Sequence, residues 1–134
     1  MINFTIEWLA GFFDGEGSIG IYLRNTNKQK TKKYYVLVIS LAQSGLIGEK
    51  ICKTLQSIYG GSVYCQQSVN KPQWKWNISA NKAADFLYVI KPYLINKKEE
   101  AELGFLFQGL LDKNEFNPEA KDFAAQLKTC KLNY

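Results

Sequence analysis

Apolar and polar positions along this chain follow two periods, and each change of period marks a new element. A two-residue period, typical of half-buried strands, runs through residues 19–24 and again through 34–42. A helical period follows over residues 46–59, and Gly60 and Gly61 end it. The first part of the chain therefore predicts two strands followed by a helix.

The same succession recurs farther along the chain, and helices flank it on both sides. Strands are expected at 63–67 and 73–78, and helices at 6–14, 81–90, 96–111 and 117–128. The resulting order, αββαββα with added C-terminal helices, predicts an α+β fold with antiparallel β-hairpins. A length of 134 residues favours a single domain over residues 1–134.

The charge balance adds a class of partner to this picture. The chain has 17 Lys and Arg against 12 Asp and Glu, a net charge of +5. Such an excess favours phosphate polymers or anionic membranes as partners, although a lysine-rich solvated surface is an equal alternative. The absence of histidine excludes Ser-His-Asp and Cys-His hydrolysis, and also nucleases that use a histidine base.

Composition further predicts an intracellular protein without a membrane anchor. No apolar run approaches the ~20 residues of a membrane helix, and no signal sequence opens the chain, so we expect the mature protein to begin near Met1. The three cysteines share no metal-ligand spacing and are expected as reduced thiols. No motif for a small-molecule cofactor is present.

The segment WLAGFFDGEGS combines an apolar helix with small residues on one side. Thr5 can cap this helix, and Gly11 and Gly15 lie four residues apart on one face. A glycine inside a helix costs about 0.5–1 kcal/mol relative to alanine, so a compensating contact is expected. The spacing favours the close approach of a second helix.

Two carboxylates, Asp14 and Glu16, follow at the end of the same helix. Acids are unfavourable at the negative end of a helix unless a cation joins them, and carboxylate and carbonyl oxygens suit Mg²⁺. We expect Glu16 to project beyond the helix end and Asp14 to cap backbone groups or brace the turn. A plain glycine-rich turn is the main alternative, whereas a calcium loop lacks its bidentate acid.

The segment LAGFFDGEGS closely resembles the signature of LAGLIDADG homing endonucleases. It matches at Leu9, Ala10, Gly11, Asp14 and Gly17. The resemblance continues through YYVLVISLAQ, IYGGSVY, WKWNIS and FLYVIKPYLINKKEEAE, in the order typical of the family. It implies an α+β fold whose β-hairpins form a DNA-binding saddle.

The resemblance also implies an active centre. Glu16 would bind divalent metal beside the scissile phosphates, with the Gly15 carbonyl as a second ligand. Gln43 would orient the attacking water, or instead cap the next helix. Lys97 would stabilise charge on the phosphate, with Lys98 as its rival and a solvated lysine as the alternative. Two or three Mg²⁺ per dimer are expected, and Mn²⁺ or Ca²⁺ can substitute in binding.

Two positions depart from the family pattern, and the signature occurs only once. Glu16 stands where many relatives have Asp. Ile47 stands where a basic residue is common in the family; either Lys50 or Lys53 takes the place of that basic residue, or the chain has no equivalent of it. A single signature supplies half an active centre, which implies a homodimer. Its expected interface consists of Leu9, Ala10, Gly11, Phe12 and Gly15.

One face of the expected hairpins carries polar, aromatic and basic residues that suit DNA. A two-stranded ribbon fits the major groove, and lysines at a hairpin tip suit phosphates. The candidate contacts are Tyr22, Arg24, Thr26, Lys28, Lys30, Lys32, Lys33, Tyr34, Ser40, Gln67, Lys75 and Asn77. An ordinary solvated sheet face is the alternative.

Together these features imply a site-specific homing endonuclease that makes a staggered double-strand break by metal-dependent phosphodiester hydrolysis. Its partner would be a long, pseudo-palindromic double-stranded DNA target. The alternative is an inactive nucleic-acid-binding protein on the same scaffold, either an intron RNA maturase or a transcription regulator. An intron-encoded origin is expected, with an organelle or a bacterial or phage-infected cytoplasm as the location.

Overall fold

The computed structural model describes residues 2–25, 33–67, 70–113 and 120–132 of the chain. Helices alternate with paired strands in the order expected from the sequence, so the predicted αββαββα succession is confirmed. The elements are α1 (Ile6–Glu16), β1 (Gly17–Asn25), β2 (Lys33–Ser44), α2 (Gly45–Tyr59), β3 (Ser62–Gln66), β4 (Gln73–Ser79), α3 (Ala80–Ile90), η1 (Lys91–Tyr93), α4 (Lys98–Lys113) and α5 (Ala120–Leu132).

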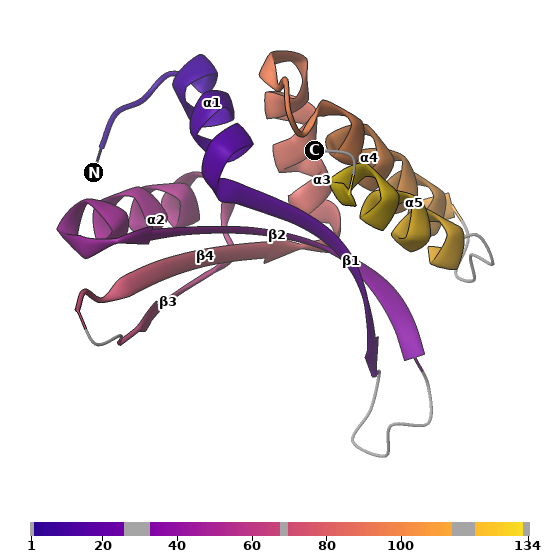
Figure 1. Cartoon of the computed structure of the whole chain (residues 1–134), viewed down its shortest axis with the longest axis horizontal. Coiled ribbons are helices and arrows are strands. Elements are labelled where there is room, and N and C mark those ends of the chain that lie inside the picture. Colours follow the sequence, from indigo (N-terminus) through magenta and orange to yellow (C-terminus); the bar gives the residue numbers. More distant parts are fainter. Residues whose placement is uncertain (1, 26–32, 68–69, 114–119, 133–134) are drawn as a thin grey trace.

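The four strands form one antiparallel sheet in the order β1-β2-β4-β3. The helices lie on one face of this sheet, and the opposite face is bare and curves into an arch (Figure 1). Alternation explains the division, because successive side chains of a strand point to opposite faces. Ile39 and Leu41 face the helices and are buried, whereas Ser40 between them faces the bare side.

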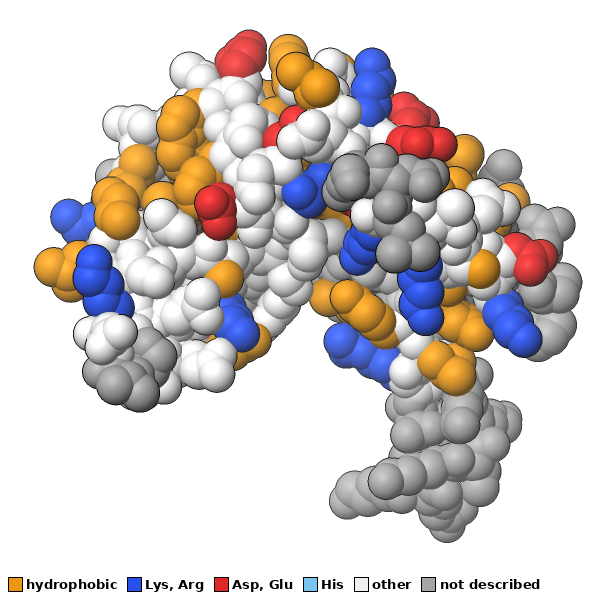
Figure 2. All heavy atoms as spheres, in the orientation of Figure 1, with side chains coloured by type: hydrophobic (Ala, Val, Ile, Leu, Met, Phe, Trp, Pro, Cys, Tyr) orange, Lys and Arg blue, Asp and Glu red, His pale blue; other side chains and the backbone are white. Residues whose placement is uncertain are grey.

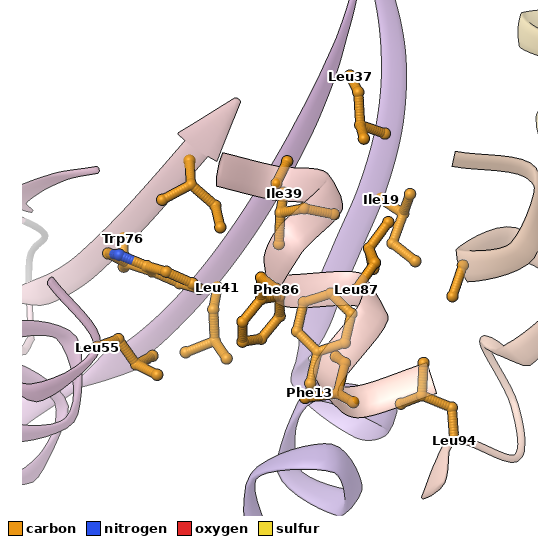
Figure 3. Close-up of a cluster of buried hydrophobic side chains, with 14 of the residues drawn as sticks. Phe13, Ile19, Leu37, Ile39, Leu41, Leu55, Trp76, Phe86, Leu87 and Leu94 are labelled. Atoms are coloured by element: carbon orange, nitrogen blue, oxygen red, sulfur yellow. The ribbon is translucent and has the colours of Figure 1, made fainter. Parts of the chain in front are cut away.

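Aromatic residues from three elements build the centre of the core (Figure 3). The Phe86 ring on α3 packs edge to face against the rings of Phe13 on α1 and Trp76 on β4. The ring centroids are 5.4 Å and 5.2 Å apart, respectively. All three side chains are fully buried. The Trp76 indole N–H also donates to the Gly60 carbonyl at 2.8 Å, so its polar atom is satisfied inside the core.

Helix α1 is longer than the sequence suggested. The Thr5 hydroxyl accepts a hydrogen bond from the backbone N–H of Trp8, as expected for its cap. The helix ends at Glu16 rather than at residue 14, so the expected position of Glu16 beyond the helix is wrong. Gly17 begins β1 directly, and glycine suits this position because a Cβ atom there would lie 2.2 Å from the Phe13 ring. Both carboxylates therefore belong to the last helical turn.

The three cysteines are free, as the sequence predicted. Burial raises the pKa of the Cys52 thiol to about 11, which keeps it protonated and unreactive at neutral pH. Among the described residues, no helix combines the length and the apolar character that crossing a bilayer requires.

Replacing Phe86 by alanine tests the aromatic core. We expect Phe86→Ala to lower the free energy of unfolding by about 3–5 kcal/mol, because it empties the site where three buried elements meet. Tyr88→Ala on the same helix is the control, since the Tyr88 side chain is 63% exposed, and it should cost less than about 1 kcal/mol. Urea titration monitored by tryptophan fluorescence measures both values, and equal losses would contradict this view of the core.

Candidate nucleic-acid interface and acidic site

The C-terminal turn of α1 is fixed to the loop that precedes α4. The Asp14 carboxylate accepts hydrogen bonds from the backbone N–H groups of Ile95 (2.8 Å), Asn96 (2.9 Å) and Lys97 (2.8 Å). The Lys97 ammonium in turn donates to the Asp14 carbonyl oxygen at 2.6 Å. Asp14 therefore caps backbone groups, as expected, although these groups belong to a loop about eighty residues away in sequence.

Electrostatics favours this arrangement at both helix ends. The Asp14 carboxylate lies just before the positive N-terminus of α4, and the Lys97 ammonium lies at the negative C-terminus of α1. Burial raises the pKa of Asp14, but the N–H groups of Asn96, Ile95 and Lys97 and the Lys97 charge outweigh it, so the pKa lies below its ordinary value. The cation that the acidic helix end requires is thus supplied in part by Lys97.

Glu16 differs from Asp14 in its surroundings. Its side chain is exposed and lines a hollow of about 250 Å³ at the start of the bare sheet face. Ser40, Lys75 and Asn77 line the same hollow, so the acidic tip of α1 opens directly onto the proposed DNA-facing side chains. The fold thus joins a carboxylate to a polar groove.

The chemistry of these donors fits a hard divalent cation in part. Gly15 belongs to the last helical turn, whose carbonyls lack intrahelical partners, and a side chain added there would meet nothing within 4 Å. Glu16 and the Gly15 carbonyl are oxygen donors of the kind that Mg²⁺ prefers. No cluster of three or more His, Cys, Asp or Glu exists among the described residues. Glu16 and the Gly15 carbonyl are therefore the donors that this helix end offers to a divalent cation.

Gln43 and Lys98 complete the set of expected catalytic positions. Leu41 pairs with Gly17, so Gln43 lies at the end of the sheet where α1 passes into β1. Gln43 pairs with Trp74 and belongs to the helix-covered face, which differs from the face of Ser40. Lys98 is exposed at the first position of α4. Of the two lysines, Lys97 is the one that touches the end of α1.

The bare sheet face is a groove continuous with the Glu16 hollow. Figure 2 shows the underside of the molecule hollowed between its two lobes. A hollow of about 850 Å³ occupies this face, and it shares three residues with the smaller one. Four of the expected DNA contacts line it: Tyr22, Arg24, Ser40 and Asn77. Gly20 leaves room for the Tyr22 ring, which a side chain at that position would meet at 2.3 Å.

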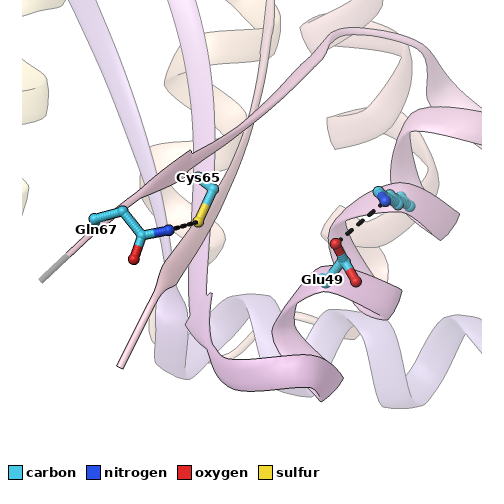
Figure 4. A network of polar contacts seen from close by, with 4 residues as sticks. Glu49, Cys65 and Gln67 are labelled. Atoms are coloured by element: carbon cyan, nitrogen blue, oxygen red, sulfur yellow. Dashed lines mark hydrogen bonds and ion pairs between the residues drawn. The ribbon is translucent and has the colours of Figure 1, made fainter. Parts of the chain in front are cut away.

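Other expected contacts lie elsewhere or outside the described structure. Gln67 follows the end of β3, and its amide donates to the Cys65 sulfur at 3.8 Å, on the side away from the groove (Figure 4). Gln67 does not line the groove, and its contact with DNA stays a prediction. Tyr34 is exposed and pairs with Arg24 on β1. Thr26, Lys28, Lys30 and Lys32 and the side chain of Lys33 fall outside the described residues.

Sequence reasoning missed several residues of the groove. Tyr64 lines both hollows and is 46% exposed, and Ser62 and Lys82 line the larger one. The sequence did carry a signal for Tyr64. Alternation along β3 places Tyr64 on the same face as Ser62 and opposite to Val63 and Cys65. Lys82 carried no such signal, because it belongs to helix α3 and reaches the groove only through the packing of α3 against the sheet.

The outer face of α1 differs from the expected interface. Leu9 and Ala10 are fully buried within the chain, so their side chains are unavailable to a partner, which corrects two of the five expected positions. Gly11 and Gly15 are open, with nothing within 4 Å of a side chain added at either position. Phe12 stacks on Trp8 with ring centroids 5.0 Å apart. The exposed surface is therefore a glycine seam bordered by aromatic rings.

The sequence profile of LAGLIDADG endonucleases matches residues 9–103. This match covers most of the chain, including most of α1, the whole sheet and the acidic site. The chain belongs to the LAGLIDADG endonuclease family. A search of curated proteins finds no significant match.

Solved structures share the fold at low sequence identity. I-CvuI, solved in complex with the I-CreI target in the presence of 2 mM Mg with DNA not cleaved, has a TM-score of 0.76 and 23% identity over 93% of this chain and 80% of that chain. I-LtrWI bound to its target DNA has a TM-score of 0.72 and 20% identity over 96% of this chain. The alignment covers only 44% of the I-LtrWI chain.

Replacing Asp14 by asparagine tests the connection between α1 and the loop before α4. We expect Asp14→Asn to lower the free energy of unfolding by about 1–3 kcal/mol at neutral pH, because hydrogen bonds to a charged acceptor become neutral ones. A lowered pKa stabilises the fold above the ordinary carboxyl pKa of 3.8, and this contribution disappears as the pH falls through the folded value. The difference between wild type and variant should therefore shrink below about pH 4.

Asp85→Asn, on the exposed side of α3, is the matched control. It should change stability by less than about 0.5 kcal/mol at either pH. Denaturant titrations between pH 3 and pH 7 give the comparison. If the difference in the free energy of unfolding between wild type and Asp14→Asn were independent of pH, the charge of Asp14 would not stabilise the fold.

Proposed function

We propose that this protein is a homodimeric, divalent-metal-dependent, site-specific homing endonuclease that makes a staggered double-strand break in DNA. The observation that carries the proposal is the shared hollow at the tip of α1. There an exposed carboxylate, Glu16, faces the same space as Ser40, Lys75 and Asn77 of the bare sheet. A carboxylate that opens into a polar groove suits phosphodiester hydrolysis beside a bound duplex.

The roles of the residues follow from their positions. Glu16 and the Gly15 carbonyl would hold metal, and Mg²⁺ when bound would activate water and stabilise the leaving oxygen. The Lys97 ammonium, held on the Asp14 carbonyl, keeps a positive charge at the helix tip for the scissile phosphate. Gln43 lies at the same end of the sheet and would orient the attacking water.

A second copy would complete the site. The described residues of one chain form no cluster of three or more acidic, His or Cys ligands, and α1 leaves an open seam at Gly11 and Gly15. Two helices that pack through these glycines bring their Glu16 side chains together at a two-fold axis. The chain spans less than half of I-LtrWI, which also fits one half of a two-part assembly.

The groove would receive double-stranded DNA. Tyr22, Arg24, Ser40 and Asn77 line it with donors and acceptors, and the net charge of +5 per chain attracts phosphates. A two-fold dimer places two such grooves end to end, so a long pseudo-palindromic target is expected. Cutting on both strands near the axis would produce the staggered break.

Replacing Glu16 by glutamine tests the cleavage chemistry. We expect Glu16→Gln to reduce the rate of cleavage by at least about 100-fold while DNA binding is retained, because the amide keeps the shape and loses the charge that holds the metal. The substrate is the duplex that wild type selects from a randomised pool, cut in Mg²⁺ and followed on gels. Glu7→Gln, in the first turn of the same helix, should cut like wild type.

Wild-type cleavage by Glu16→Gln would remove this carboxylate from the mechanism. Binding without any cleavage by the wild-type protein, in Mg²⁺ or Mn²⁺, would instead favour a nucleic-acid-binding protein on the same scaffold.

Replacing Gly11 by leucine tests the dimer. A Cβ atom added there has no neighbouring atom of its own chain within 4 Å, so we expect an unchanged fold but loss of the dimer with target DNA. Gly109→Leu is the matched control, because Gly109 is an open helical glycine on α4 and lies outside the seam. Sedimentation of the protein with and without duplex measures both. Equal dimerisation of the two variants would rule out packing through Gly11.

A further inference from the structure

Asn77 lies at the centre of the bare sheet face. Its strand, β4, is an inner strand, so Asn77 is paired with Ser40 of β2 on one side and with Ser62 of β3 on the other. Asn77 lines both the large and the small hollow. Whatever occupies the groove therefore meets this side chain.

Of the two serines, Ser40 forms a hydrogen bond with the Asn77 amide and Ser62 does not, among the described residues. The Ser40 hydroxyl donates a hydrogen bond to Asn77 Oδ1. In the described part of the chain, Ser62 makes no such bond to it. The terminal torsion of an asparagine is broad and its two ends differ chemically, so a single hydrogen bond is enough to select an orientation. The Ser40 bond turns the oxygen toward β2 and leaves the nitrogen on the β3 side.

This orientation defines what the amide presents to the groove. Oδ1 has two lone pairs and Ser40 occupies one, so an acceptor remains beside an N–H donor on the outward edge. Adenine presents the complementary pair in the major groove, with N7 as acceptor and the N6 amino group as donor. Guanine offers two acceptors there, and cytosine offers only a donor.

We propose that Asn77 reads an adenine at one base pair of each half-site, and that Ser40 is the positioning residue that holds its amide for this contact. The inference rests on the proposed DNA-binding function and extends it by naming the base. Ser40 acts through Asn77, because its hydroxyl fixes the orientation of the amide. A preorganised amide loses less conformational freedom on binding and discriminates more sharply.

The experiment uses the dimeric wild-type protein and a randomised duplex pool, with Ca²⁺ in place of Mg²⁺ to prevent cutting. The selected duplex is then remade with each base pair replaced in turn, and dissociation constants are measured. We expect Asn77→Ala to lose discrimination at one pair per half-site, and that pair to be A·T. Wild type should discriminate there by about 10- to 100-fold.

The serines supply matched controls. Ser40→Ala should lower the discrimination at the same pair by about 2- to 10-fold, the contribution of one hydrogen bond. Ser40→Thr keeps the hydroxyl and should restore it. Ser62→Ala removes the other serine opposite Asn77 and should leave it unchanged. Asn77→Asp keeps the shape and the Ser40 bond, and should move the preference toward cytosine, whose amino group suits a carboxylate.

Three results would overturn the inference and leave the nuclease proposal intact. They are a G·C pair at the affected position, wild-type discrimination by Ser40→Ala, or equal losses for Ser40→Ala and Ser62→Ala. If the wild-type protein enriches no sequence from the pool, both proposals fail. The two failures are therefore distinguishable from one data set.

Discussion

The Asp14 carboxylate receives three backbone N–H groups from residues 95–97, and much of the acidic site depends on that contact. It joins the negative end of α1 to the positive end of α4, and the Lys97 ammonium returns a hydrogen bond to the Asp14 carbonyl. Each charge therefore lies beside the helix end that favours it. With the last turn of α1 held on both sides, Glu16 has a fixed base from which to project.

The same strand alternation that builds the core also builds the groove. Leu41 and Trp76 pair on the helix side and are buried, while Ser40 and Asn77, one residue earlier and one residue later, pair on the bare side. The twisted sheet curves away from its helices, so the uncovered face is the concave one (Figure 1). The polar groove thus requires no extra element, since it is the uncovered face of an ordinary antiparallel sheet.

The sequence predicted the elements well where the pattern was local. The helix of α2 and its end at Gly60 follow from apolar spacing and a terminating glycine. The sequence-based prediction failed where an element is fixed by residues distant in sequence. Helix α1 continues to Glu16, and its last turn is held by hydrogen bonds between Asp14 and the loop before α4. Tyr64 and Gln67 fall on opposite faces of any regular strand that contains both, and alternation alone does not tell which of the two faces the helices cover.

What the sequence by itself determined was the succession of elements, the signature with its two acids, and the basic charge, because periodicity and composition are properties of neighbouring residues. Only the tertiary structure decided which side chains of α1 remain outside. Leu9 and Ala10 carry the family signature yet lie in the core, and Gly11 and Gly15 form the open seam. The partnership of Ser40 with Asn77 was also beyond the sequence. Pairing of strands nearly forty residues apart depends on the register of the whole sheet, which no local pattern contains.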